Sequence, residues 1–473
     1  MRLRILVLAV LVAAVGLAPT PAGAAPTPST TGSAPALRLV TPVFSLRRVA
    51  GVLAGTVADS HLGSDLDKVM TDPAIGGARD NSCLVVGDAG GGTSHYAHAA
   101  DQGYIPASTL KLLTTDAALA QLGPDSHFTT EIRAGAAPAD GAVGDLFMVG
   151  GGDPLLATAD FAVDAGYQGQ SRLATSMEAL ADKVVATGIR RVGRILGDDS
   201  RYDDQRLVPT WKPSYVADFE ISPLSALVVN KGFASTKPPV EAASPAAHAA
   251  GVLATLLRAR GVTVGATGAA KAPAGAPLVT SIDSPPLTDV VGEILQNSDN
   301  MGAEMLLKEL GVRAGGAGST AAGLGVAATL LQKVAGISPN EMSVVDGSGL
   351  DRSDRVTCAA LERVLDRSGE TGDLGKALST AGQSGTLQKR FGGTPAAGKV
   401  RAKTGSLSGV TGLAGFATAQ NGQELSFALL ANELPSDAAG TTLQDKVVSV
   451  LATYPRAPAA DELAPLPPAA PSG

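Results

Sequence analysis

Aromatic residues, cysteines and histidines are all scarce in this chain. Phe, Trp and Tyr make up only 3% of the 473 residues while hydrophobic residues reach 45%, so the core must be built mainly from Ala, Val and Leu. Two cysteines exclude a disulfide-rich scaffold. The five histidines include no H-E-x-x-H zinc motif, and we expect no metal or other cofactor. The formal net charge of -7 argues against nucleic acid or an anionic membrane as a partner.

Long hydrophobic runs are also absent, apart from one at the N-terminus. Residues 1–24, MRLRILVLAVLVAAVGLAPTPAGA, place two arginines before an apolar run that ends in small residues. This pattern is typical of a secretory signal peptide cleaved after Ala24. An uncleaved anchor is the alternative, although the run is shorter than the ~20 residues that a membrane span needs. We therefore expect an extracytoplasmic protein, in the periplasm or cell wall, with no integral membrane span.

The few residues that could form cross-links or metal sites give no decisive pattern. Export permits a disulfide between Cys83 and Cys358, but the sequence does not show whether they meet, and two small buried hydrophobic side chains are the alternative. His95 and His98 lie on a predicted strand, and we expect them at the surface rather than as metal ligands. Three glycines over 90–92 indicate a turn and not a phosphate-binding loop, because no G-K-[ST] follows them.

The pattern along the chain predicts a folded domain interrupted by an insertion. The signal peptide (1–24), a linker and N-terminal approach (25–52) and a Pro/Ala-rich disordered tail (456–473) flank the folded part. Segments 53–123 and 287–455 together predict the main domain, and 124–286 an inserted, mostly β domain or domains. In the main domain we expect a helix over 53–70, a hairpin of SCLVVGD and SHYAHA, a helix from Pro106 to Leu122, mostly helices over 287–373, three strands in KVRAKTG, VTGLAGFATA and LSFALLANEL, and a closing helix over 442–454.

The stretch IPASTLKLLTT, residues 105–115, places Ser108 and Lys111 one helical turn apart. Lys111 is flanked by leucines, and burial lowers the pKa of a lysine, so a neutral amine becomes available to accept a proton. A serine hydroxyl becomes a good nucleophile when an adjacent base removes its proton. The pair therefore predicts a nucleophile and its base. The alternative interpretation of this S-x-x-K sequence is an ordinary serine in the first turn of a helix, followed by a lysine whose ammonium group extends to solvent.

Two further stretches raise the specificity of this pattern. Ser298-Asp299-Asn300 lies where one helical pattern ends and another begins, so that Asp299 or Asn300 could simply be a helix cap. Lys403-Thr404-Gly405-Ser406 lies on a predicted strand, where its lysine and hydroxyls could bind a carboxylate. Gly405 would let a substrate backbone approach closely. A strand-end turn with a solvated lysine is the other reading of this segment.

The order S-x-x-K, S-D-N, K-T-G is the motif set of penicillin-binding proteins and class A β-lactamases. The sequence therefore resembles the serine DD-peptidase superfamily. The interval between Ser108 and Ser298 is much longer than a compact β-lactamase needs, which is typical of class C low-molecular-mass penicillin-binding proteins, the D-alanyl-D-alanine carboxypeptidase/endopeptidase family S13. LFMVGGGDPLL and VVDGSGLDRSDRVT also look like that family. The resemblance implies an α/β (α+β) fold with an antiparallel sheet flanked by helices, a helical subdomain and a large, mostly β insertion.

The resemblance also implies a mechanism. Ser108 attacks a peptidoglycan stem peptide at the penultimate D-Ala, Lys111 is the base, and Ser298 with Lys403 passes a proton to the leaving amine. Asn300 binds the substrate backbone, and the backbone N–H groups of Ser108 and Ser406 form the oxyanion hole. Thr404, Gly405 and Ser406 would line the carboxylate site. β-Lactams would acylate the same serine and remain bound.

Two assignments address the third residue of the stem peptide. A diaminopimelate side chain carries both an ammonium and a carboxylate, so its site needs an anion and a cation. Arg352 is the candidate cation and Asp203 the candidate anion, although both could be ordinary surface charges. Asp351 stands where the family more often has a small polar residue. Asp346 and Ser348, with the glycines around Ser348, are expected to form a turn that supports the site.

Two alternatives remain. One is a β-lactamase or esterase on the same fold, which in class A would need a glutamate to activate the deacylating water. The other is a non-catalytic penicillin- or peptidoglycan-binding module, which the intact set of motif residues argues against. The sequence leaves open the choice between carboxypeptidase and endopeptidase, the oligomeric state and the role of the insertion.

Overall fold

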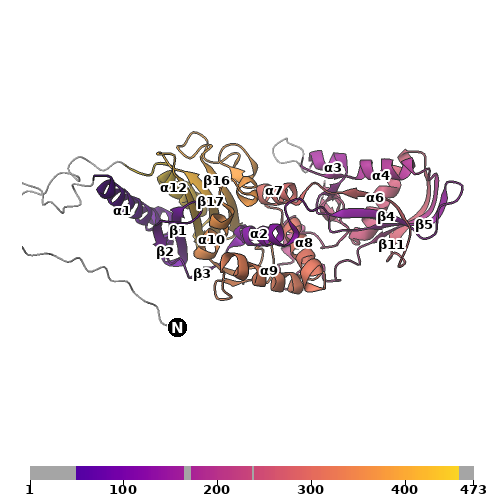
Figure 1. Ribbon diagram of the computed structural model, residues 1–473, viewed down its shortest axis with the longest axis horizontal. Coiled ribbons are helices and arrows are strands. Elements are labelled where there is room, and N and C mark those ends of the chain that lie inside the picture. Colours follow the sequence, from indigo (N-terminus) through magenta and orange to yellow (C-terminus); the bar gives the residue numbers. More distant parts are fainter. Residues whose placement is uncertain (1–49, 165–171, 237–238, 457–473) are drawn as a thin grey trace, which may run out of the picture.

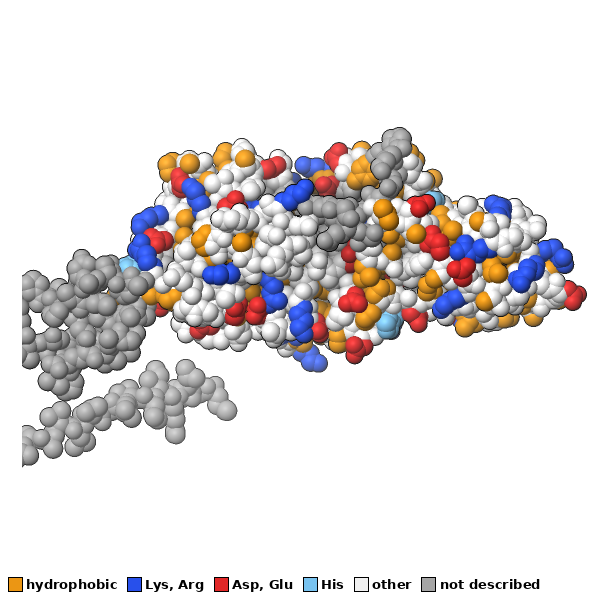
Figure 2. Space-filling model, turned by 90° about the horizontal axis from the view of Figure 1, so that it is seen from above, with side chains coloured by type: hydrophobic (Ala, Val, Ile, Leu, Met, Phe, Trp, Pro, Cys, Tyr) orange, Lys and Arg blue, Asp and Glu red, His pale blue; other side chains and the backbone are white. Residues whose placement is uncertain are grey.

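The computed structural model describes residues 50–164, 172–236 and 239–456; the predicted signal peptide, nearly all of the linker and the tail lie outside this range. The molecule is elongated, with a β-sheet towards each end and a group of helices between them (Figure 1). Figure 2 shows acidic and basic side chains interspersed over one face of the described chain, without a patch of a single sign.

The larger sheet is built from both ends of the chain. Its order is β15-β16-β17-β18-β1-β2, and all neighbouring strands are antiparallel. The strands are β1 (Ser82–Asp88), β2 (Ser94–His98), β15 (Ser379–Thr380), β16 (Val400–Leu407), β17 (Val410–Thr418) and β18 (Glu424–Ala431). The predicted hairpin and the three C-terminal strands are confirmed, and β1 joins them because it pairs with β18 from Ser82↔Ala431 to Asp88↔Leu425.

Both faces of this sheet are covered, because alternate residues of a strand point to opposite faces. Leu84 and Val86 pack with helices α1 (Ala50–Met70) and α12 (Asp437–Ala452). Cys83 and Val85 pack on the other face, with α10 (Cys358–Ser368) and the central helices. The closing helix begins five residues before the predicted start because the Ser436 hydroxyl caps it, accepting a hydrogen bond from the Ala439 N–H.

The central region is helical, as predicted, and surrounds α2 (Leu110–Leu122). Every residue of this helix from Leu110 to Ala118 is buried, so that the helix lies inside the core. It packs against α7 (Leu287–Asn297), α8 (Asn300–Leu310), α9 (Thr320–Ala335) and α10. The main domain also contains the short helix α11 (Asp373–Lys376) and the small sheet β13-β14-β3, formed by Met342–Ser343, Arg355–Thr357 and Gly103–Tyr104.

The insertion has its own sheet and core. Its sheet has the order β11-β8-β5-β4-β12, with parallel pairs β11–β8 and β8–β5 and antiparallel pairs β5–β4 and β4–β12. Helices α4 and α6 connect the parallel strands and pack with them in a separate hydrophobic core. The sheet elements are β4 (Thr129–Ala134), β5 (Ala142–Val149), α4 (Met177–Ala186), β8 (Arg191–Asp198), α6 (Pro245–Ala259), β11 (Thr263–Ala269) and β12 (Leu278–Asp283).

Shorter elements join the insertion to the central helices. They are β6 (Leu156–Ala157), α3 (Ala159–Asp164), β7 (Thr175–Ser176), α5 (Ser214–Ala217), β9 (Phe233–Thr236) and β10 (Pro239–Glu241). Around them, Tyr202 and Trp211 pack against Met301 and Met305 of α8. The insertion is therefore in direct contact with the helix that follows the S-D-N motif.

The scarce cysteines and histidines now have defined surroundings. Cys83 and Cys358 form a disulfide that ties β1 to the start of α10. The prediction that His95 lies at the surface is wrong: its side chain is only 6% exposed and hydrogen-bonds to Asp59 and Asp88, both at 2.9 Å. In the described part of the chain, no group of His, Cys, Asp or Glu side chains could hold a metal ion.

Among the described helices, none alone is long and apolar enough to cross a membrane. The bent pair Asn300–Gly315 and Thr320–Ala335 has the required length and composition, with an angle of 75° between its halves.

Candidate active site

Ser108 lies in a short 3₁₀ turn, Ala107–Thr109, that leads directly into α2. Ala107 has a positive φ of 46°, which is rare for a residue with a side chain. The Thr109 hydroxyl fixes the turn by donating to the Pro106 carbonyl at 2.7 Å. Ser108 is the least buried residue of this turn. Because the turn leads into the buried helix α2, the Ser108 hydroxyl lies at the N-terminal end of that helix.

Lys111 is buried and contacts Ser108 directly. Its Nζ lies 2.7 Å from the Ser108 Oγ, 2.6 Å from the Asn300 Oδ1 and 2.7 Å from the Ser348 carbonyl oxygen. Burial lowers the pKa of Lys111 to about 7, opposed by the nearby carboxyl groups of Asp346, Glu304 and Glu220. A neutral amine can donate to Asn300 and Ser348 and accept the Ser108 proton with its lone pair. The arrangement fits a general base.

The S-D-N motif brings two more side chains to this centre. Helix α7 ends at Ser298, which adopts the left-handed conformation (φ 56°), and α8 begins at Asn300. The Ser298 Oγ accepts a hydrogen bond from the Lys403 Nζ at 2.9 Å. Asn300 bridges Lys111 to the insertion, because its Nδ2 donates to the Glu220 carbonyl oxygen at 2.7 Å.

Lys403 is as deeply buried as Lys111. Its Nζ also donates to the Thr404 carbonyl at 2.7 Å, and burial together with the nearby Lys111 holds its pKa well below the ordinary value. The reason expected for Gly405 was close approach of a substrate. The structure shows a further reason, since a Cβ there would lie 2.7 Å from the Pro106 carbonyl oxygen. Gly405 lets β16 pack against the turn that carries Ser108.

The turn around Ser348 supports the site, as expected. A Cβ on Gly349, whose φ is +81°, would lie 1.9 Å from the Ala107 carbonyl oxygen, so this turn packs directly on the serine turn. Asp346 accepts hydrogen bonds from the Gly349 and Asp351 N–H groups at 2.7 and 2.9 Å. Asp351 turns back onto Ser353, whose hydroxyl donates to it at 2.6 Å.

Glu304 is a supporting residue that the motif search missed. It is fully buried on α8, and its Oε1 accepts from the N–H groups of Gly347 and Ser348 at 2.9 and 2.8 Å. Burial, with Asp346 nearby, raises its pKa to about 8. The available signal was a glutamate within a hydrophobic helix, six residues after Ser298. Such a residue is costly to bury unless it is paired or protonated.

The two residues predicted to read a stem-peptide side chain have different surroundings. Arg352 is exposed, and it donates to the Ser408 carbonyl at 2.9 Å, beside the end of β16. Asp203 instead forms an ion pair with the buried Lys308 of α8. Because its carboxylate already balances that lysine, this placement argues against the predicted role of Asp203 as the anion of the substrate site.

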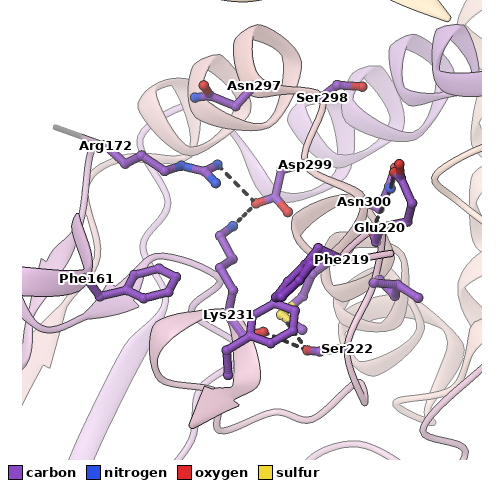
Figure 3. A pocket seen from close by; sticks show the side chains of 13 residues that line it. Phe161, Arg172, Phe219, Glu220, Ser222, Lys231, Asn297, Ser298, Asp299 and Asn300 are labelled. Atoms are coloured by element: carbon purple, nitrogen blue, oxygen red, sulfur yellow. Dashed lines mark hydrogen bonds and ion pairs between the residues drawn. The ribbon is translucent and has the colours of Figure 1, made fainter. Parts of the chain in front are cut away.

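A cavity of about 440 Å³ adjoins the centre at Ser298 and Asn300. The rings of Phe161, Phe219 and Phe233 line it from the insertion side. Figure 3 shows Lys231 and Arg172 pointing towards Asp299 in the same cavity. Sequence reasoning gave no role to these residues, which lie far apart in the chain.

The site can be compared with known proteins. A model of the D-Ala-D-Ala carboxypeptidase 3 (S13) family matches residues 62–243 and 235–454. The chain belongs to this family. Its membership confirms the prediction made from the order and spacing of the three motifs, and with it the assignment to the serine peptidases that act as D-Ala-D-Ala carboxypeptidases.

Curated relatives and solved structures agree. The chain is 34% identical to carboxypeptidase DacB of Mycolicibacterium smegmatis, over 73% of this chain and 75% of the relative. It is 31% identical to a D-alanyl-D-alanine carboxypeptidase of an Actinomadura species, over 84% and 85%. The crystal structure of penicillin binding protein 4 (dacB) from Haemophilus influenzae has a TM-score of 0.68 at 20% identity and covers 83% of this chain and 99% of its own. The predicted fold class is confirmed.

Proposed function

We propose that this chain is a serine D-Ala-D-Ala carboxypeptidase that acts on peptidoglycan stem peptides through an acyl-enzyme on Ser108. The observation that carries the proposal is the 2.7 Å contact between Ser108 Oγ and a buried lysine whose pKa is about 7. Family membership supplies the substrate class. Curated relatives at 31–34% identity carry the names of carboxypeptidases.

In the proposed acylation step, the Ser108 Oγ attacks the carbonyl carbon of the penultimate D-Ala and its proton passes to the Lys111 Nζ. Collapse of the tetrahedral intermediate breaks the peptide C–N bond. Ser298 gives its proton to the departing amine of the terminal D-Ala, and Lys403 replaces that proton. Backbone N–H groups of Ser108 and Ser406 hold the oxyanion.

Substrate binding is proposed along the outer edge of β16. The short strand β15 pairs only with Arg401 and Ala402, so the described sheet has no strand opposite residues 403–407 on that side. An extended peptide can add to such an edge through backbone hydrogen bonds. Thr404 and Ser406 would bind the terminal carboxylate there, and Arg352, close to the end of this strand, remains the candidate cation for a side-chain carboxylate of the stem peptide.

The decisive experiment is intact-protein mass spectrometry after incubation with benzylpenicillin. We expect the mature chain to gain the mass of one penicillin and to retain it, and Ser108→Ala to gain nothing. Ser94→Ala, on β2 away from the site, is the matched control and should be acylated normally. Acylation of Ser108→Ala, or no reaction of the native chain, would refute the proposal.

The preference between carboxypeptidase and endopeptidase activity follows from product analysis. A stem pentapeptide that ends in D-Ala-D-Ala tests the first activity, through release of free D-Ala. A cross-linked dimer of stem peptides tests the second, through release of monomers. We expect cleavage of the pentapeptide, and both activities should disappear together in Ser108→Ala.

Glu220 favours a second candidate function, slow hydrolysis of β-lactams. Its Oε2 lies 3.3 Å from the Asn300 Nδ2, and the residue is exposed to water. A glutamate there could accept a proton from the water that attacks the acyl-enzyme. In this case Glu220→Gln would prolong the life of the penicillin adduct at least tenfold, whereas an unchanged lifetime would remove the second candidate.

Export completes the proposal. A peptidoglycan hydrolase must reach the cell wall, and residues 1–24 have the pattern of a cleaved signal peptide. We expect the secreted protein to begin at Ala25, as N-terminal sequencing would detect. A chain retained with Met1 in the membrane fraction would indicate an uncleaved anchor instead.

A further inference from the structure

The middle residue of the S-D-N motif is held by two basic side chains from the insertion. The Lys231 Nζ forms an ion pair with the Asp299 Oδ2, and the Arg172 guanidinium lies 3.8 Å from the same oxygen (Figure 3). These groups are mostly buried, since the Asp299 side chain is 7% exposed and that of Lys231 is 13% exposed. Arg172 is itself fixed by Glu293 of α7 at 2.5 Å. The contact therefore joins the insertion to the main domain at the reactive centre.

Asp299 does not act as the helix cap that its position suggested. It occupies the N-cap position of α8, but its side chain accepts no hydrogen bond from the first turn of that helix. The carboxylate points to Lys231 instead (Figure 3). A helix cap therefore does not explain this residue, whereas the buried ion pair does.

The neighbours of Asp299 are the two motif residues that must be placed accurately. Ser298 precedes it in a left-handed conformation (φ 56°) that a serine rarely adopts unless its surroundings fix it. Its Oγ meets Lys403 at 2.9 Å, and the Asn300 Oδ1 meets Lys111 at 2.6 Å. A rotation of the peptide units on either side of Asp299 would move both contacts at once.

Lys231 is held firmly enough to act as a fixed point. It lies in the turn Asn230–Gly232, where Asn230 and Lys231 both have φ of 55°. The Asn230 Oδ1 accepts a hydrogen bond from the Thr158 N–H at 2.9 Å, and the Ser222 hydroxyl donates to the Lys231 carbonyl at 2.7 Å. The turn is thus fixed on both sides by other parts of the insertion.

We propose that the Lys231–Asp299 ion pair is a positioning device through which the insertion holds Ser298 and Asn300 in the geometry needed for acylation. Lys231 is a positioning residue and does not touch the reacting atoms. Arg172 shares the same carboxylate and keeps its negative charge compensated. The insertion would thereby be required for the chemistry itself. The inference rests on the proposed function, because its readout is acylation of Ser108.

The test compares Lys231→Met and Lys231→Arg with the native chain and with Lys271→Met, an exposed lysine of the insertion that serves as the control. Two acyl donors are used: benzylpenicillin, which is small, and a stem pentapeptide. We expect Lys231→Met to lower the acylation rate of both donors by a similar factor of roughly 10–100, because a misplaced catalytic group slows the chemical step for every donor. KM for the peptide should change less than threefold. Lys231→Arg should recover part of the rate, since its guanidinium can pair with the same carboxylate.

Asp299→Asn is the second variant, in case Lys231→Met fails to fold. It should show the same equal loss for both donors. A loss confined to the peptide, with a raised KM, would show that Lys231 binds substrate and would overturn the inference. Unchanged acylation in Asp299→Asn and the Lys231 variants would overturn it as well. If the native chain itself is not acylated, the proposed function fails, and this outcome is distinct from a failure of the ion-pair inference.

Discussion

The pH dependence of acylation tests the central feature of the site, a lysine that acts as a base near neutral pH. Burial lowers the pKa of Lys111 from 10.5 to about 7. Only the neutral amine can take the Ser108 proton, so the acylation rate should follow the fraction of neutral lysine. The rate should rise about tenfold per pH unit below 7 and become constant above it.

The lowered pKa of Lys111 determines how much of the enzyme is competent for acylation at neutral pH. At pH 7 about half of the molecules carry a neutral Lys111, compared with roughly 0.03% for a lysine of ordinary pKa, a gain on the order of a thousandfold. The same shift of about 3.5 pH units corresponds to ~5 kcal/mol. The lowered pKa also destabilises the folded state. The unfolded chain binds this proton as the pH falls from about 10.5 to 7, whereas the folded chain does not. The free energy of unfolding therefore decreases as the pH falls through that range.

The assay is stopped-flow acylation by a fluorescent penicillin between pH 5 and about 10.5. Lys111→Arg places a permanent charge at the same position and should abolish acylation at every pH. Lys68→Arg, an exposed lysine on α1, is the matched control and should follow the native profile. A rate that is flat from pH 5.5 to 8.5, or that first rises above pH 9, would refute the assignment of Lys111 as the base.

Three further outcomes are expected. Gly349→Ala should lower acylation at least tenfold because its Cβ would meet the serine turn at 1.9 Å, whereas Gly275→Ala, with a similar φ of +75° and open space around it, should acylate normally. Replacing Cys83 and Cys358 together by alanine should lower the free energy of unfolding by roughly 2–5 kcal/mol, measured in urea, because the disulfide closes a long loop. Burial raises the pKa of Asp354 to about 10, so the folded state keeps a proton that the unfolded state loses above pH 4, and its stability falls as the pH rises. Asp354→Asn should remove this loss, which is at most ~1.4 kcal/mol per pH unit, and leave a flatter stability profile between pH 5 and 8.

Much of the main domain could be predicted from the sequence because its signals are local. The hairpin, the three C-terminal strands and the buried helix after Ser108 each have a distinct hydrophobic pattern, and the structure contains all of them. The three motifs could be recognised together because acyl transfer needs a nucleophile, a base and a proton relay, which restricts the residue types at each position. The contacts Ser108–Lys111 and Ser298–Lys403 follow that expectation.

Other features could not be predicted because they depend on contacts between distant segments. Lys231 and Asp299 meet only through the packing of the insertion on α8, and no spacing in the sequence indicates it. His95 was expected at the surface because an alternating strand offers a solvent face, but Asp59 of α1 and the Tyr454 ring, just after α12, lie against it. The sequence predicted a role for Gly405 in substrate approach, but not its packing against Pro106, because that turn lies far away in the sequence.

The two buried lysines of the site suggest how the proton moves during catalysis. Lys111 and Lys403 are both fully buried, and proximity to Lys111 contributes to the lowered pKa of Lys403. When Lys111 takes the Ser108 proton it becomes positively charged, and a charge there disfavours a proton on Lys403. Lys403 can pass its proton only to a group that it already contacts. Its Nζ lies 2.9 Å from the Ser298 Oγ, which donates to the leaving amine in the proposed mechanism. In the proposed mechanism, acceptance of a proton at Lys111 would therefore promote the release of a proton from Lys403, so that the two coupled groups would serve as base and acid in the same step.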